Sequence, residues 1–280
     1  TADVAFAAWQ YYKATEDTDF LLEKGFEMIM DTARFWVSRL DFDRDRGLYV
    51  IRCVIGPDEY KEHVDNDVYT NYMAHYNMRL ALELVRRFRG SAVPGEREAY
   101  GRLRDKLGLE RLERELEEKM PALYLPTPDD QTGIIPQCDG YFELEELDIR
   151  GYKESEKVLT IYEDLSQEQI NSYQIAKQGD LVVLMFLLAE LFDKKTRERN
   201  YRFYEDRTLH DSSLSKSTHS ILACDLGLME EAYRLFEGAC RVDLGNDKRS
   251  SDAGIHSASM GGIWQAAVMG FGGVRMEEGM

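Results

Sequence analysis

Apolar residues recur at every third or fourth position through most of the chain. Between residues 19 and 40 they form one stripe along a helix, made up of Leu22, Phe26, Ile29, Ala33, Trp36 and Leu40. The same spacing predicts helices at about residues 3–14, 67–89, 96–119, 179–192, 214–225, 229–240 and 257–271. Because strand-like alternation is scarce, we expect an all-α chain.

The predicted helices differ in how much of their surface is apolar. Some carry one apolar stripe, whereas the helix after Gly179 is apolar on all sides. This mixture indicates a double layer, in which inner helices are buried between neighbours and outer helices are exposed on one face. A ring of antiparallel helix pairs has both kinds of helix. No linker divides residues 1–280, so we expect a single domain.

Long segments rich in Gly, Pro and aromatic residues join some of the helices, at residues 41–66, 121–176 and 241–256. Loops of this length inside a compact domain are usually functional. The functional site is therefore expected in these segments and at the helix starts that follow them.

Composition narrows the class of protein. Hydrophobic residues make up 44% and charged residues 31% of the 280 residues, which is typical of a globular protein. The formal net charge of -17 argues against a nucleic-acid partner, because such binding depends on clustered Lys and Arg. The most apolar run, residues 181–189, is far shorter than the roughly 20 residues that a membrane span needs, so no membrane partner is expected.

Cys53, Cys138, Cys224 and Cys240 include no CxxC pair. Neither a zinc cluster nor a disulfide framework is indicated, so we expect no metal and reduced thiols in a cytoplasmic protein. The chain begins at Thr1 in helical sequence, which favours a piece of a longer protein.

The run Gly56-Pro57-Asp58-Glu59-Tyr60 gathers unusual residues between two predicted helices. Pro57 restricts the backbone and Gly56 permits close approach, so Glu59 is a candidate acid held at the mouth of a cavity. A solvated loop acid is the alternative, and the residues by themselves leave it open.

Polar donors precede three of the predicted helices. Lys177 and Gln178 offer donors to sugar hydroxyls, or form a solvated helix start. Residues 210–215 and 250–257 are rich in Ser and precede helices whose free N–H groups attract anions, which suggests phosphate. Ordinary serine capping is the alternative, and no P-loop sequence occurs.

Six blocks in order along the chain resemble glycoside hydrolase family 65, which contains maltose, kojibiose, nigerose and trehalose phosphorylases. The blocks are TADVAFAAWQYY, VIGPDEYKEHVDNDVYTNYMA, IIPQCDGYFELEE, AKQGDLVVLMFLL, HDSSLSKSTHSILACDLG and RVDLGNDKRSSDAGIHSASMGGIWQAAVMGFGGV. The resemblance implies an (α/α)6 barrel. It also implies an inverting phosphorylase that cleaves an α-linked glucose disaccharide with inorganic phosphate into β-glucose 1-phosphate and a sugar.

The resemblance assigns roles to individual residues. It implies that Glu59 is the general acid and that Lys177 and Gln178 contact the substrate glucose. Phosphate is implied to lie near Ser212, Ser213, His256 and Ser257. Because phosphate is itself the nucleophile, no second carboxylate is needed, and no cofactor is expected beyond phosphate as co-substrate. An acid that must hold its proton until the bond breaks calls for a partly buried Glu59.

Members of this family also carry an N-terminal β-sandwich, a helical linker, the first barrel helices and a C-terminal β-sheet cap. We expect these parts outside residues 1–280, so the barrel in this chain is expected to be incomplete and inactive without the rest of the protein. The resemblance also implies a homodimer for the full-length protein.

Two other functions stay open. A hydrolase of the same family would place a carboxylate across the sugar from Glu59, and Asp252 is the candidate. A helical scaffold without catalysis would not depend on Glu59. The disaccharide is not specified, because the choice of acceptor is expected to depend on variable loops such as residues 121–176. The blocks are most similar to the kojibiose and trehalose phosphorylase branches.

Overall fold

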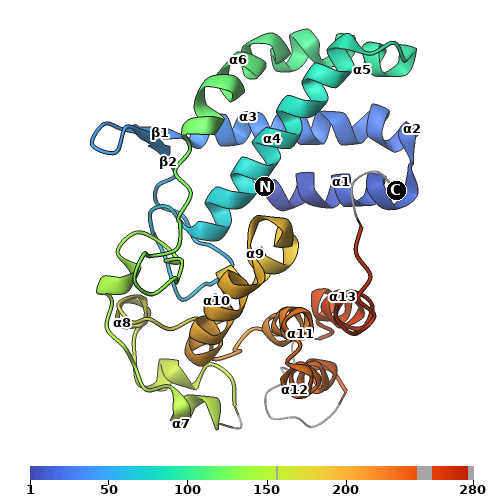
Figure 1. Ribbon diagram of the computed structural model, residues 1–280. Coiled ribbons are helices and arrows are strands. Elements are labelled where there is room, and N and C mark those ends of the chain that lie inside the picture. Colours follow the sequence, from blue (N-terminus) through green and yellow to red (C-terminus); the bar gives the residue numbers. More distant parts are fainter. Residues whose placement is uncertain (156, 245–253, 277–280) are drawn as a thin grey trace. The chain divides into compact units, whose positions relative to one another are not determined.

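The computed structural model describes residues 1–155, 157–244 and 254–276, which form two compact units (Figure 1). The first unit consists of Thr1–Arg52, Thr70–Leu125 and the last described residue, Met276. The second consists of Cys53–Tyr69 and the described part of Pro126–Arg275. Helices dominate both units, so the prediction of an all-α chain is confirmed. The single domain over residues 1–280 stays a prediction.

The first unit is built around α3. Its elements are α1 (Ala2–Thr15), α2 (Thr18–Phe20), the π turn η1 (Leu21–Gly25), α3 (Phe26–Arg39), β1 (Asp41–Asp43), β2 (Leu48–Val50), most of α4 (Val68–Gly90), α5 (Pro94–Leu107), α6 (Leu109–Lys119) and η2 (Met120–Ala122). The predicted stripe at residues 19–40 is the buried face of α3, where Phe26, Ile29 and Ala33 are fully buried. The centroid of the Phe26 ring lies 4.4 Å from the centroid of the Phe88 ring in α4.

Two predictions in this unit were wrong in detail. The helix predicted at residues 96–119 is broken at Gly108, whose φ of 64° is left-handed and ends α5. The segment after residue 40 holds a short antiparallel hairpin, with Asp41 paired to Val50, where a loop was expected. Strands of three residues are too short for their alternation to be recognised in the sequence.

The second unit carries most of the candidate site residues. Its elements are η3 (Tyr141–Glu143), α7 (Arg150–Lys153), η4 (Thr160–Glu163), α8 (Gln167–Asn171), α9 (Asp180–Leu187), η5 (Ala189–Leu191), α10 (Lys194–Arg207), α11 (Ser215–Leu226), α12 (Met229–Cys240), α13 (Ser257–Gln265) and the π turn η6 (Ala266–Phe271). The segment predicted as a loop at residues 121–176 therefore contains, in the part of it that the structure describes within this unit, four short helical turns.

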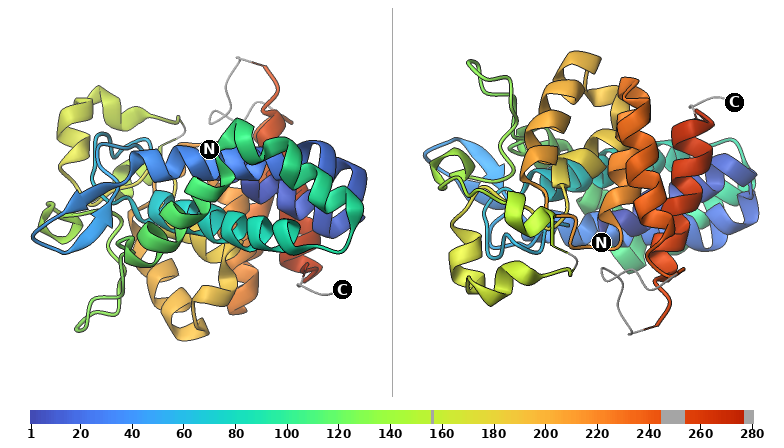
Figure 2. Two further views of the ribbon diagram at one scale, coloured as in Figure 1. Left: turned by 90° about the horizontal axis from the view of Figure 1, so that it is seen from above. Right: turned by 90° about the horizontal axis from the view of Figure 1, so that it is seen from below.

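Helix α11 lies at the centre of this unit and packs against α9, α10, α12 and α13. Figure 2 shows α11, α12 and α13 side by side. Small residues allow the close approach: a Cβ added at Gly262 in α13 would lie 2.4 Å from Oγ of Ser217 in α11. Helix α9 is buried on most sides, as its uniformly apolar sequence predicts.

The sequence pattern did not predict α10. Its sequence, KKTRERNYRFYEDR, has few apolar residues, and its buried face is made of Asn200, Tyr201, Tyr204 and Glu205. Asp193 begins the helix by accepting a hydrogen bond from the backbone N–H of Thr196 at 2.7 Å. A helix that buries amides, phenols and a carboxylate has no apolar stripe to detect.

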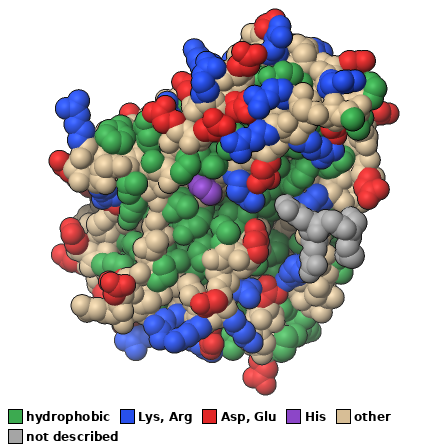
Figure 3. All heavy atoms as spheres, turned by 45° about the horizontal axis from the view of Figure 1, so that its top comes forward, with side chains coloured by type: hydrophobic (Ala, Val, Ile, Leu, Met, Phe, Trp, Pro, Cys, Tyr) green, Lys and Arg blue, Asp and Glu red, His purple; other side chains and the backbone are tan. Residues whose placement is uncertain are grey.

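In the face drawn in Figure 3, Lys and Arg side chains are mixed with Asp and Glu side chains mainly along the edges, and hydrophobic side chains gather inside them. None of the described helices is long and apolar enough to cross a membrane.

Candidate active site

The segment from Gly56 to Lys61 rests on buried carboxylates in the second unit. A Cβ at Gly56 would lie 2.5 Å from a carboxylate oxygen of Asp67 and equally close to one of Asp180, so only glycine fits there. The carbonyl of the next residue, Pro57, accepts a hydrogen bond from Nε2 of Gln178 at 2.5 Å. The close backbone approach predicted for Gly56 is therefore confirmed.

Asp58 holds this segment to the start of α9. Its carboxylate is fully buried and accepts the backbone N–H groups of Tyr60 at 3.2 Å and Lys177 at 2.8 Å. The other carboxylate oxygen accepts Nε2 of Gln137 at 2.9 Å. Its own backbone N–H donates to Asp180 at 2.6 Å. These four bonds fix the backbone on both sides of Glu59 and at Lys177.

Two carboxylic acids beneath the segment have raised pKa values. Burial raises the pKa of Asp58, and burial together with the neighbouring Asp67 and Asp58 raises that of Asp180 well above its usual range. The nearby carboxyl group of Asp67 adds to this shift, because two carboxylates held close together disfavour a second negative charge. Nε2 of Gln137 also donates to Asp180, at 3.2 Å.

Lys61 is a buried cation in the same place. Its ammonium group donates to the carbonyls of Ile170 at 3.2 Å and Tyr173 at 2.5 Å. Burial lowers the pKa of Lys61, while Asp58 opposes that shift. Lys61 therefore stabilises the buried carboxylate of Asp58 and ties the segment to α8 and to the residues that follow α8.

Glu59 projects outward from this base. Its side chain is 60% exposed, so the partial burial expected of a general acid is not supplied by the described residues. Its carboxylate forms an ion pair with Nζ of Lys177, and the backbone beneath it is fixed by Asp58. Lys177 thus contacts Glu59, and Gln178 contacts the carbonyl of Pro57 in the same segment, while the predicted contact of both residues with glucose stays a prediction.

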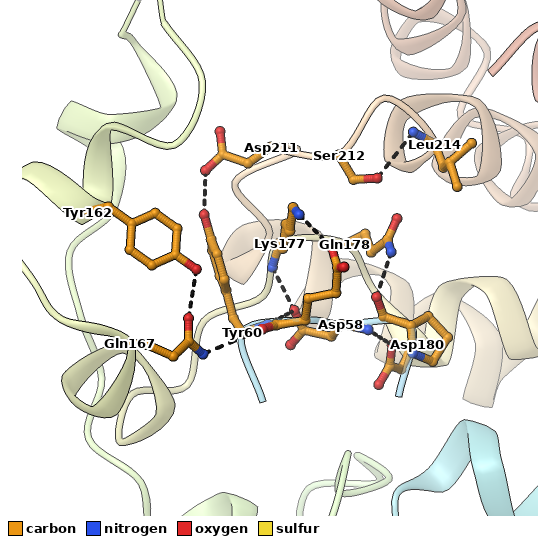
Figure 4. Close-up of polar contacts among 12 residues, drawn as sticks. Asp58, Tyr60, Tyr162, Gln167, Lys177, Gln178, Asp180, Asp211, Ser212 and Leu214 are labelled. Carbon is orange, nitrogen blue, oxygen red and sulfur yellow. Dashed lines mark hydrogen bonds and ion pairs between the residues drawn. The ribbon is translucent and has the colours of Figure 1, made fainter. Parts of the chain in front are cut away.

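Tyr60 connects Glu59 with the serine-rich segment before α11. Its hydroxyl donates to the carboxylate of Asp211 at 2.7 Å, and the neighbouring Ser212 is drawn on the same side in Figure 4. Burial and the Asp211 carboxylate both raise the pKa of Tyr60, so the phenol keeps its proton. This bond places Asp211 and Ser212 close to the segment that carries Glu59.

The two serine-rich segments meet at the starts of α11 and α13. The hydroxyl of Ser259 donates to the carbonyl of Ser213 at 3.0 Å. Ser212 caps the turn before α11 by accepting the N–H of Leu214 at 3.3 Å. Ser257 is the first residue of α13, directly after His256. The structure therefore brings together the four residues predicted to lie near phosphate.

His256 is held by Asp243, which the sequence did not indicate. The backbone N–H of His256 donates to Asp243 at 2.9 Å, and its Nδ1 lies 2.7 Å from the other carboxylate oxygen. These bonds hold the pKa of Asp243 below its usual range. Asp252, the candidate base of a hydrolase, lies outside the described residues.

The comparison with known proteins identifies the family. Residues 1–265 match the glycosyl hydrolase family 65 central catalytic domain. The chain belongs to glycosyl hydrolase family 65. The predicted family is thus confirmed on a match that covers most of the chain.

Relatives that match nearly the whole chain include several disaccharide phosphorylases by name. The chain is 43% identical to kojibiose phosphorylase of Halothermothrix orenii, over 99% of this chain and 35% of the relative. It is 38% identical to α,α-trehalose phosphorylase of Thermoanaerobacter brockii, over 98% of this chain and 35% of the relative. The chain therefore spans about a third of the length of these relatives.

A solved structure extends the family 65 match to the fold. A putative kojibiose phosphorylase from the human microbiome superposes with a TM-score of 0.87 at 31% identity, over 99% of this chain and 39% of that one. The (α/α)6 barrel class predicted from the resemblance is confirmed.

The sequence pattern does not indicate several residues of the candidate site. Asp58 and Tyr60 belong to the singled-out run, but nothing in the pattern distinguishes their buried roles from that of Glu59. Gln137 and Asp243 lie 79 and 13 residues from their partners, so spacing cannot pair them.

Proposed function

We propose that the full-length protein is an inverting glycoside phosphorylase, which cleaves an α-linked glucose disaccharide with inorganic phosphate to β-glucose 1-phosphate and a sugar. The observation that carries this proposal is the outward-facing Glu59, ion-paired to Lys177 on a rigid, buried base, in a chain similar to kojibiose and trehalose phosphorylases.

In this proposal Glu59 is the general acid. It gives its proton to the glycosidic oxygen as the bond from C1 to that oxygen breaks, and it is left as a carboxylate. A phosphate oxygen forms the new bond to C1 from the opposite face, which inverts the anomeric centre. The part of the burial that the described residues do not supply would come from the bound sugar, which covers the carboxylate.

Lys177 and Gln178 are proposed to hold the glucose. Both lie beside Glu59, and the backbone N–H of Lys177 is fixed by Asp58. When sugar hydroxyls bind to the Lys177 ammonium group, its ion pair with Glu59 weakens.

Phosphate is proposed to bind to the hydroxyl groups of Ser212, Ser213 and Ser257 and to His256. Support comes from the contact that joins the two segments, between Ser259 and Ser213, and from Asp243, which orients the imidazole of His256. Hydroxyl and imidazole groups can donate to phosphate oxygens without bringing a negative charge near an anion. No cofactor other than phosphate enters this reaction.

We further propose that the full-length protein is a cytoplasmic homodimer. The free thiols of Cys53, Cys138, Cys224 and Cys240 support a reducing compartment. Light scattering of the purified full-length protein tests the dimer, and a monomeric mass would contradict it.

The function is tested by incubating the full-length protein with a panel of α-linked glucose disaccharides, with and without inorganic phosphate. Release of β-glucose 1-phosphate that depends on phosphate, with the anomer assigned by NMR, is the expected result. Glucose released at equal rates without phosphate would replace the proposal with a hydrolase. No cleavage of any disaccharide would favour a scaffold.

A further inference from the structure

Three ionisable side chains lie behind the serine-rich segment, and one of them, Glu205, hydrogen-bonds to both of the others. Glu205, near the end of α10, accepts Nε2 of His210 at 3.1 Å and also contacts Nδ1 of His219 in α11. The two imidazole rings are 4.7 Å apart and nearly perpendicular. We call Glu205, His210 and His219 the triad.

Hydrogen bonds determine the protonation of the triad. Each imidazole carries its N–H on the nitrogen that faces the Glu205 carboxylate, since that oxygen can only accept. Nδ1 of His210 then accepts the hydroxyl of Ser215, which lies 2.8 Å away. Burial lowers the pKa of His210 to about 4, so this ring is neutral at neutral pH.

His210 has an unusual backbone conformation immediately before the proposed phosphate segment. Its φ of 56° is left-handed, which is unfavourable for a residue with a Cβ. Both of its ring nitrogens are hydrogen-bonded, so the side chain holds the backbone in this conformation. The direction in which Asp211, Ser212 and Ser213 leave His210 is therefore set by the triad.

The triad also touches the other side of the proposed site. A Cβ at Gly179, the residue after Gln178, would lie 3.0 Å from Nε2 of His219. His219 is buried, and its Nε2 has no hydrogen-bond partner among the described residues. One group of side chains thus packs beneath the start of α9 and fixes the start of the serine-rich segment.

We propose that Glu205, His210 and His219 are positioning residues that hold Ser212 and Ser213 in the orientation that binds phosphate. The inference rests on the proposed function and assigns the triad no contact with reacting atoms. The triad's ligand atoms lie within 4.8 Å of one another, so a divalent metal is the competing explanation. Direct hydrogen bonds between Glu205 and both imidazoles favour positioning, because a metal would have to break them.

The test uses two variants of the full-length protein, His210→Ala and His210→Asn. The first removes both hydrogen bonds. The second tolerates a left-handed backbone, which lowers the risk of misfolding, but its shorter side chain does not reach Glu205. The matched control is His63→Ala, because His63 also has a left-handed φ, 57°, but is exposed and outside the triad.

Both His210 variants are expected to raise the KM for phosphate by about tenfold or more, as loss of hydrogen bonds that orient an anion site should. The KM for the disaccharide and the melting temperature of His210→Asn are expected to stay near those of the control. Equal increases in both KM values, or a wild-type phosphate KM in His210→Asn, would overturn the positioning role.

Two further measurements distinguish the alternatives. If the wild-type protein cleaves disaccharides without phosphate dependence, the proposed function fails and this inference fails with it. If cleavage by the wild-type protein depends on phosphate, but both His210 variants have the wild-type KM for phosphate, the proposed function stands and only the positioning role fails. Stoichiometric zinc in the purified protein, with loss of activity on chelation, would replace positioning with a metal site.

Discussion

The two sides of the proposed site are built from opposite kinds of chemistry. On one side, Glu59 emerges from a base of buried carboxyl groups, among them Asp58 and Asp180, whose pKa values are raised. On the other, Ser212 and Ser213 are held by a triad that contains one carboxylate and a neutral His210. The first side is built from buried carboxyl groups, and the second from neutral hydroxyl and imidazole groups.

This difference matches the two tasks of a phosphorylase. A side that must deliver a proton gains from a carboxylic acid on a rigid backbone. A side that must hold an anion gains from hydroxyl donors, and carboxylates there accept hydrogen bonds: Asp211 from Tyr60 and Asp243 from His256. Substitutions on each side test whether the two sides are separate in function.

Glu59→Gln should have the largest effect. Loss of the acid is expected to lower kcat by about 10²–10⁴-fold in the full-length protein, because the leaving oxygen would depart unprotonated. The fold should be unaffected, since the side chain is 60% exposed. Glu62→Gln, three positions along the same segment, is the control in the same phosphate-release assay. A kcat near wild type would remove Glu59 from its role.

Gly56→Ala should have the next largest effect, which is a loss in the free energy of unfolding. The added Cβ would lie 2.5 Å from carboxylate oxygens of Asp67 and Asp180, and overpacking of this kind costs about 1–3 kcal/mol. Urea unfolding measures the loss. Gly101→Ala in α5 is the matched control, because nothing lies within 4 Å of that position and alanine favours a helix. Equal stability of both variants would contradict the packing described for Gly56.

His256→Ala should act on phosphate alone. We expect the KM for phosphate to rise about tenfold, as removal of a charge-assisted donor implies, with little change in the KM for the disaccharide. Initial rates with each substrate varied in turn separate the two constants. An equal effect on both would mean that the two sides of the site are not separate.

The smallest predicted effect is a pH dependence of stability with opposite signs on the two sides. His210 has a pKa of about 4 against an ordinary value of 6.5, so the unfolded state binds its proton first and stability falls as pH drops through that range. Asp58 and Asp180 have raised pKa values, so below those values the folded state is the protonated one and their contribution rises as pH falls.

His210→Asn isolates the histidine contribution to this pH dependence. Between pH 7 and about 5.5, wild type should lose about 1 kcal/mol relative to the variant, measured by urea unfolding at each pH. Glu205 has a lowered pKa, so its stabilising contribution is lost only at lower pH. Parallel pH profiles for the two proteins would contradict the buried, neutral state of His210.

The amount of structure that could be predicted from the sequence depends on whether the information is local. Periodicity identified α3 and α9 because their apolar residues are the ones that pack. It missed α10, because that helix buries Asn200 and Glu205 through hydrogen bonds. The break between α5 and α6 was also missed, because it occupies a single residue, Gly108, and the apolar spacing continues on both sides of it.

The candidate site divides in the same way. The resemblance indicated Glu59, Lys177 and Gln178, and the structure places them together. The side chains that hold them could not be predicted, because the pairs formed by Asp58 with Gln137 and by His256 with Asp243 are set by the tertiary fold. Residues that face a ligand form recognisable motifs, whereas their supports are ordinary polar residues.

Gln137 has a practical consequence for anyone who redesigns the substrate range. It belongs to the long segment at residues 121–176, where acceptor specificity is expected to be encoded, yet its amide donates to the buried carboxyl groups of Asp58 and Asp180. Exchanging the whole segment between relatives would therefore also replace a residue that supports the backbone on which Glu59 lies. A chimera should keep this glutamine in place and vary only the residues around it.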